Sequence, residues 1–117
     1  MEYMLLIYVN EAEGSRRSDA EQAQMHREYM AFTQDLVRAG KNKGGNALEK
    51  AAAASTVRVR DGKIMVTDGP FAETKEQLGG YYLVEAKDPD EAISIAARIP
   101  GAKHGSIEVR PVMKIHM

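Results

Sequence analysis

The sequence predicts an α+β fold in which two helices cover one face of an antiparallel sheet. Strand-like apolar segments and two amphipathic helical segments follow one another in the order strand, helix, strands, strand, helix, strand. This order is that of the ferredoxin-like, or split βαβ, arrangement. An Asp-Gly dipeptide between two alternating segments adds a β-hairpin to the plan. With 117 residues, 44% of them hydrophobic, the chain is expected to form one domain over residues 1–117.

The N-terminal part is expected to contain one strand and the longest helix. Nearly every residue from Tyr3 to Val9 is apolar, as in strands that are covered on both faces. The polar segment from Asn10 to Arg17 is expected to be a loop. A helix follows from about Asp19 to Ala39, because Ser18 and Glu21 have the spacing of a capping box. The apolar stripe of this helix comprises Met25, Tyr29, Phe32 and Leu36, and Met30 and Val37 widen it.

The middle of the chain carries the hairpin signal. Asp61-Gly62 joins two alternating strands over residues 56–60 and 63–67. The two-residue turn fixes which residues of the two strands face each other. The expected pairs are Arg60 with Lys63, Val59 with Ile64, Arg58 with Met65 and Val57 with Val66.

The other elements follow from capping and breaking residues. Residues 80–86 form a strand, and a helix begins after Asp88, which has capping-box spacing to Glu91, and ends at Ile99 before Pro100. A last strand covers residues 106–110 with Val112 and Met113, and Pro111 suits the edge of a sheet. Ahead of the hairpin we expect a polar connection at 41–46, a short strand at 47–49 and a connector at 51–54.

The first strand also predicts an oligomer. Helices on one face of the sheet leave the other face uncovered, yet Tyr3 to Val9 is apolar on both sides. A second copy of the chain, packed sheet against sheet about a two-fold axis, supplies the missing cover. We therefore expect a homodimer.

Composition excludes several function classes. The formal charge of −1 and the pI of about 6.3 lack the basic footprint of direct nucleic-acid binding. The absence of cysteine excludes disulfides and thiolate metal sites and fits a cytoplasmic location. The apolar N-terminal run is too short to span a membrane. No nucleotide-binding or nicotinamide-binding glycine motif is present, so no cofactor is expected, and His26, His104 and His116 lack metal-ligand spacing.

Residues 68–82 form the most distinctive segment of the chain. It begins with Asp68-Gly69-Pro70-Phe71, continues through the charged Glu73, Lys75 and Glu76, and ends with Gly79-Gly80. In one interpretation this turn is structural: Asp68 caps it and Phe71 anchors the loop. In the other, the rigid turn holds Asp68 as a general base or ligand-orienting carboxylate. The glycine pair permits close approach to another surface, either a ligand or a partner subunit.

Three stretches, residues 3–8, 57–63 and above all 67–82, resemble the DGPF branch of the YCII-related proteins. The resemblance covers essentially the whole chain and implies a dimeric α+β barrel, a fold also used by muconolactone isomerases and small cofactor-free monooxygenases. It implies no specific reaction. Some YCII-related proteins have a proposed His and Asp catalytic dyad, and DGPF members often accompany extracytoplasmic-function sigma factors. His26 matches the helix position of that His. Asp35 lies nine residues further along, more than two helical turns away, so Asp68 from the loop is the better candidate for the partner.

Two functional hypotheses remain open. In the first, the chain is a small-molecule enzyme or binding protein for an anionic or aromatic ligand, with His26 and Asp68 as the catalytic pair. In the second, it is a non-catalytic dimeric accessory protein with a partner in sigma-factor, that is transcription, regulation. Each candidate also has an ordinary structural interpretation, as a boundary histidine, a solvated loop charge or a packing aromatic. The candidate substrate-binding residues are Tyr8, Arg58, Phe71, Glu73, Lys75 and Tyr82.

Overall fold

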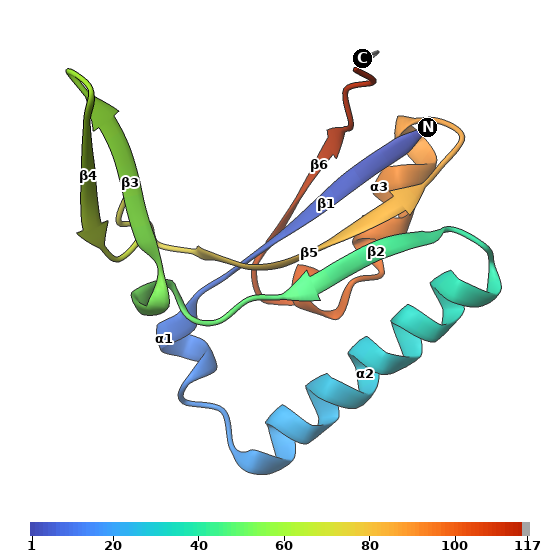
Figure 1. Cartoon of the computed structure of the whole chain (residues 1–117). Coiled ribbons are helices and arrows are strands. Elements are labelled where there is room, and N and C mark those ends of the chain that lie inside the picture. Colours follow the sequence, from blue (N-terminus) through green and yellow to red (C-terminus); the bar gives the residue numbers. More distant parts are fainter. Residues whose placement is uncertain (116–117) are drawn as a thin grey trace.

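The computed structural model describes residues 1–115 and has a four-stranded sheet, helices and a separate two-stranded hairpin (Figure 1). His116, one of the three histidines that lack metal-ligand spacing, lies outside the described residues. The elements are β1 Glu2–Val9, α1 Glu11–Gly14, α2 Asp19–Arg38, β2 Asn42–Ala47, the 3-10 turn η1 Ala51–Ala53, β3 Ser55–Arg60, β4 Lys63–Asp68, β5 Gln77–Glu85, α3 Pro89–Ala97, the 3-10 turn η2 Pro100–Lys103 and β6 Ser106–Pro111.

The four-stranded sheet has the order β2-β5-β1-β6, and every neighbouring pair is antiparallel. Strand β5 lies between β2 and β1, which is the split that the order of elements predicts. The α+β class and the antiparallel sheet are therefore confirmed. Strand β6, which ends in Pro111, lies at an edge of the sheet as expected.

The hydrophobic core lies on one face of this sheet only. Tyr3, Leu5 and Ile7 of β1 are buried against side chains of both α2 and α3, so both helices cover the same face. The opposite face, here called the open face, presents Met4, Leu6, Tyr8, Tyr81 and Leu83, all partly exposed, with Glu2, Glu85 and Glu108 at its margins. The core residues are Tyr3, Leu5, Ile7, Phe32, Leu36, Val84, Ala86, Ala92, Ile95, Ala96 and Ile99.

Helix α2 begins and ends where its sequence signals predict. The Glu21 backbone N–H donates to Ser18 Oγ at 3.1 Å, and the Ser18 N–H donates to Glu21 Oε1 at 3.0 Å, which completes the capping box. At the other end Gly40 has φ 71°, and the Lys41 N–H donates to the Leu36 carbonyl at 3.0 Å. A left-handed glycine with this bond is a Schellman ending.

The predicted width of the apolar stripe on α2 is wrong. Phe32 and Leu36 are buried, but Met30 is 49% exposed and Val37 is 58% exposed. A residue next in sequence lies about 100° around a helix, so Val37 points well away from the line of Leu36. The helix therefore uses a narrow stripe, and its contact with the core is confined to its C-terminal half.

Three predicted boundaries are also wrong. Residues 42–47 form β2, whereas we expected a polar connection at 41–46 and a short strand at 47–49. Backbone pairing with β5 decides this, and Gly45 permits it, since a Cβ there would lie 2.6 Å from the Tyr81 carbonyl oxygen. Strand β5 begins at Gln77 rather than Gly80, because a bulge at Gly79 keeps it paired with β1. The predicted loop after β1 contains α1, whose first turn is capped by Asn10.

The hairpin register is confirmed at every predicted pair. Strands β3 and β4, residues 55–68 and here called the arm, form a two-stranded sheet of their own. Figure 1 shows the arm at upper left, standing away from the four-stranded sheet. The apolar face of the arm comprises Val57, Val59, Ile64 and Val66, and each of these side chains is between 59% and 75% exposed.

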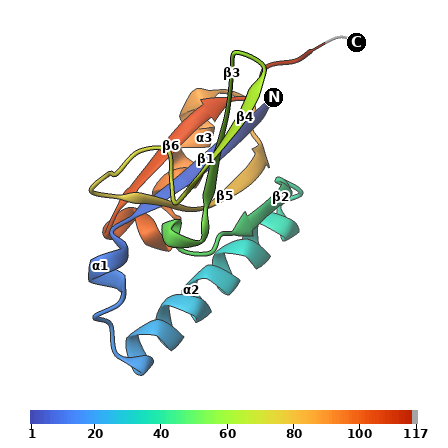
Figure 2. The same ribbon diagram turned by 60° about the vertical axis from the view of Figure 1, so that its left-hand side comes forward.

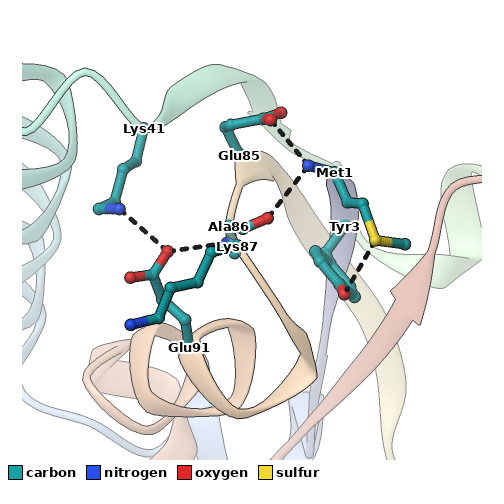
Figure 3. Close-up of polar contacts among 7 residues, drawn as sticks. All are labelled: Met1, Tyr3, Lys41, Glu85, Ala86, Lys87 and Glu91. Atoms are coloured by element: carbon teal, nitrogen blue, oxygen red, sulfur yellow. Dashed lines mark hydrogen bonds and ion pairs between the residues drawn. The ribbon is translucent and has the colours of Figure 1, made fainter.

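Helix α3 starts in a network of polar contacts in which Glu91 binds Lys41 and Lys87 (Figure 3). Asp88 Oδ1 accepts from the Glu91 N–H at 2.8 Å, and Glu91 Oε1 accepts from Lys41 Nζ and from the Lys87 N–H, each at 3.0 Å. The hydrogen bond from Lys41 and the one from the Lys87 backbone hold the pKa of Glu91 below its ordinary value. Helix α3 ends at Ala97, and Ile99 is buried just beyond it.

Leu36 and Val37 provide a test of the one-sided core. Leu36→Ala removes a side chain that is 1% exposed and is expected to lower the free energy of unfolding by about 2–5 kcal/mol. Val37→Ala, the matched control, is expected to stay within about 0.5 kcal/mol. Urea unfolding followed by circular dichroism measures both, and equal losses would contradict the observed placement of α2.

Glu91 should make stability depend on pH. Because its pKa is lowered on folding, its contribution is present above the unfolded value and is lost as pH falls through the folded value. Glu91→Gln is therefore expected to lower the Tm at pH 7 and to have no effect once the pH lies well below about 4. Asp90→Asn is the control, since Asp90 shares the first turn of α3. A Tm difference for Glu91→Gln that persists unchanged in acid would contradict this account.

Candidate functional site

A cavity of about 490 Å³ lies between α2 and the sheet and is here called the helix-side cavity. In Figures 1 and 2 the N-terminal end of α2 lies farther from the sheet than its C-terminal end. The cavity occupies this divergence. Its lining residues come from β1, α2, β2 and β5, and are Ile7, Val9, Gln22, Met25, His26, Tyr29, Thr33, Gly45, Asn46, Ala47, Gly79, Gly80, Tyr81 and Tyr82.

Two hydroxyl groups join α2 to the sheet at this cavity. Thr33 Oγ1 donates to the Tyr29 carbonyl at 2.9 Å and lies 2.7 Å from the Tyr82 hydroxyl. A threonine hydroxyl has one proton, so Tyr82 must be the donor in the second bond. The Tyr82 ring also meets Phe32 edge to face, with centroids 5.2 Å apart. These contacts fix the position of the Tyr82 side chain.

Tyr29 supplies a hydroxyl whose proton is free to donate. Its oxygen accepts from the Gly101 N–H at 3.1 Å, so the bond uses a lone pair and leaves the O–H available. Burial raises the pKa of Tyr29, so the phenol stays protonated at neutral pH. A Cβ at position 101 would lie 2.6 Å from the tyrosine oxygen, so a larger residue there would displace the Tyr29 hydroxyl.

His26 lies at the exposed rim of the helix-side cavity. It precedes Tyr29 by three residues and Thr33 by seven, so the three side chains follow one edge of α2. Within residues 1–115 no hydrogen bond or ion pair holds the imidazole, so both of its nitrogens are available to a ligand. His26, Tyr29 and Tyr82 line the same cavity, and an imidazole is a common proton-transfer group in enzymes.

A second and larger hollow of about 1160 Å³, the arm-side cleft, lies between the end of β1, η1 and the loop that follows the arm. Glu11 fixes its floor, since its carboxylate accepts from the Ala51 N–H at 2.9 Å and its N–H donates to Gln77 Oε1 at 3.0 Å. The pKa of Tyr8 is raised by loss of hydration and by its hydrogen bond to Glu108. The predicted residues that line this cleft are Tyr8, Phe71, Glu73 and Lys75.

The structure divides the predicted site residues among several places. His26 and Tyr82 line the helix-side cavity, whereas Arg58 lies on the arm and lines neither hollow. Asp68 ends β4, where it pairs with Ser55, and it also lines neither hollow. The pairing of His26 with Asp68 remains a prediction.

Tyr29 and Thr33 were missed as site residues. Tyr29 was assigned to the apolar stripe, and Thr33 was not considered. Their spacing from His26, three and seven residues, was a usable signal, because it places polar groups along one edge of a helix. The hydrogen bond between Thr33 and Tyr82, by contrast, depends on the packing of α2 against β5.

Within residues 1–115 no three His, Asp or Glu side chains are grouped as metal ligands would be. In the same part of the chain, no helix combines the length and apolar character needed to cross a membrane.

Residues 1–116 match the YCII-related domain. The chain belongs to the YCII-related family. It is also 40% identical over 114 residues to the uncharacterized protein R00369 of Rhizobium meliloti (strain 1021), an alignment that covers 96% of this chain and 92% of that protein. This YCII-related protein thus shares nearly its whole length with a relative whose printed name states no activity.

Tyr29 provides a test of the hydroxyl arrangement. Tyr29→Phe leaves the buried Gly101 N–H without its acceptor and is expected to lower the free energy of unfolding by about 1–3 kcal/mol. Tyr8→Phe, which removes an exposed bond to Glu108, is expected to change it by less than about 0.5 kcal/mol. Chemical denaturation measures both, and a loss from Tyr29→Phe no larger than that from Tyr8→Phe would contradict the assignment.

Proposed function

We propose that this YCII-related protein binds a small anionic or aromatic molecule in the helix-side cavity and that His26 exchanges a proton with it. The observation that carries the proposal is the convergence of polar groups from α2 and β5 on a partly apolar cavity. Ile7, Val9 and Met25 provide surface for a ring. The free Tyr29 proton suits a carboxylate or a developing oxyanion.

Asp68 has a structural role in this proposal. The Gly69 N–H donates to the Ala54 carbonyl at 2.7 Å, and Thr56 Oγ1 donates to the Gly69 carbonyl at 2.9 Å. Gly69 has φ 95°, a conformation that favours glycine. These contacts support a structural turn that joins the end of β4 to the start of β3 at the base of the arm. The sequence of residues 68–71, Asp-Gly-Pro-Phe, is also the basis on which we assign the chain to the DGPF branch of the family.

The proposal includes a cytoplasmic homodimer of the α+β barrel type. The partly exposed apolar side chains of the open face support the dimer, and the absence of cysteine supports the compartment. The second candidate function is a non-catalytic accessory protein with a sigma-factor-related partner. The exposed apolar face of the arm is the observation that favours it, because such surfaces serve protein–protein contact.

A thermal-shift screen against small carboxylic acids and phenols tests the ligand site. At a ligand concentration 100 times Kd, binding stabilises the folded state by about 2.7 kcal/mol, which is a measurable Tm increase. His26→Ala and Tyr82→Phe are each expected to weaken binding of a hit by about tenfold, as loss of one polar contact does.

His104→Ala is the matched control, because His104 is an exposed histidine in the loop after η2 and lines neither hollow. It is expected to leave the affinity unchanged. The absence of any stabilising compound, or equal loss in the His104 and His26 variants, would overturn the ligand site and favour the accessory function.

A further inference from the structure

The helix-side cavity is lined by uncharged side chains apart from His26. Among residues 1–115, its lining contains no lysine, arginine, aspartate or glutamate. His26 itself is exposed and lies at the rim. A carboxylate that moves from water into such a cavity loses hydration, and no buried cation compensates the loss. The lining therefore favours a ligand that is uncharged in the part that enters the cavity.

The two tyrosine hydroxyls of the α2 and β5 walls have opposite hydrogen-bonding capacity. The Tyr29 oxygen accepts from the Gly101 N–H, so its own proton is free. The Tyr82 hydroxyl donates its proton to Thr33 Oγ1, because the single Thr33 proton is directed to the Tyr29 carbonyl. The Tyr82 oxygen keeps free lone pairs. The cavity thus offers one donor, Tyr29, and one acceptor, Tyr82.

The donor and the acceptor lie close enough to be used by one small ligand. Burial raises the pKa of Tyr29 most, and the nearby Tyr82 raises that pKa further. The Gly101 hydrogen bond and the charge of Arg17 act in the opposite direction without reversing the rise. The Tyr29 phenol therefore keeps its proton at neutral pH and remains a donor beside Tyr82.

The wall opposite α2 consists largely of backbone. Gly45, Gly79 and Gly80 have no side chains, so a flat ligand can lie directly against the peptide groups of β2 and β5. Gln22 and Asn46 also line the cavity, but the amide nitrogen of each already donates to another protein group. The two tyrosines therefore decide how a ligand is oriented. A volume of about 490 Å³ is within the range of small-molecule sites.

We propose that the ligand of the helix-side cavity is an uncharged planar ring with a carbonyl and an N–H side by side on one edge, as in a cyclic amide. Its carbonyl accepts from Tyr29, and its N–H donates to Tyr82. Thr33 is a positioning residue, because it holds the Tyr82 proton and so makes Tyr82 an acceptor. This inference rests on the proposed ligand site and narrows its ligand class to uncharged aromatic molecules.

Three ring compounds of similar size test the ligand class. The probes are 2-quinolone, which has both groups, N-methyl-2-quinolone, which lacks the N–H, and 2-naphthoate, which is an anion at pH 7. Titrations followed by the backbone amide NMR signals of Gly45, Gly79 and Gly80 give Kd and locate the binding. 2-Quinolone is expected to bind at least about tenfold more tightly than either of the other two.

Thr33→Val tests the role of Thr33 without a large change in side-chain volume. It removes the acceptor of the Tyr82 proton, so Tyr82 can then donate, and the preference for 2-quinolone over N-methyl-2-quinolone is expected to fall to less than about threefold. Thr67→Val is the matched control, since Thr67 is an exposed threonine of β4 that lines neither hollow. It is expected to keep the wild-type preference. A purely structural role for Thr33 would weaken both probes equally and leave their ratio unchanged.

Each outcome decides a separate point. Equal affinity of the wild type for 2-quinolone and 2-naphthoate would overturn the uncharged class, and equal affinity for the two quinolones would overturn the pairing with Tyr82. Both results would leave the ligand site itself in place. Failure of 2-quinolone to shift the cavity signals, while the screen of carboxylic acids and phenols gives a hit, would overturn this inference alone. Failure of every compound in both experiments would overturn the proposed ligand site with it.

Discussion

The one-sided core centred on β1 is the constraint on which the rest of the structure depends. Strands β5 and β6 pair with β1 on both sides, and its alternate residues Tyr3, Leu5 and Ile7 are buried beneath α2 and α3. Burying an aliphatic side chain of this size contributes about 1.5–3 kcal/mol. Since α2 and α3 are both held to this face, neither covers the opposite face, and both hollows lie at the margin of the core.

The helix-side cavity exists because the strands have small residues where they face the N-terminal part of α2. Gly45, Ala47, Gly79 and Gly80 present almost no side-chain volume to α2. These glycines also serve the backbone, because a Cβ on Gly80 would lie 2.9 Å from the Asn46 carbonyl oxygen. Close pairing of β2 with β5 therefore excludes the side chains that would otherwise fill the space. The hydroxyl groups of α2 and β5 border a hollow that the sheet itself creates.

Much of the fold was predictable because its signals are local. The Ser18 capping box and the Asp61-Gly62 turn act within a few residues, and both were predicted correctly. Strand β2 was not, because its polar and glycine-rich residues become a strand only through pairing with β5. The site is a similar case. The candidate role of His26 came from a resemblance at its helix position and stays a prediction. The contact between Thr33 and Tyr82 joins residues 49 apart in sequence and depends on helix packing, which the sequence does not show.

The Asp68 to Phe71 turn is placed at the base of the arm. At this point the chain leaves β4 and the arm, and the hydrogen bonds of Gly69 with Ala54 and Thr56 close the base of the hairpin. A rigid closure fixes the direction in which the arm leaves the body. That direction also sets where Val59 and Ile64 lie, since a small rotation at the turn displaces them far more than it displaces Asp68. Gly69 adopts φ 95°, which glycine takes readily, so the turn closes the base of the arm without backbone strain.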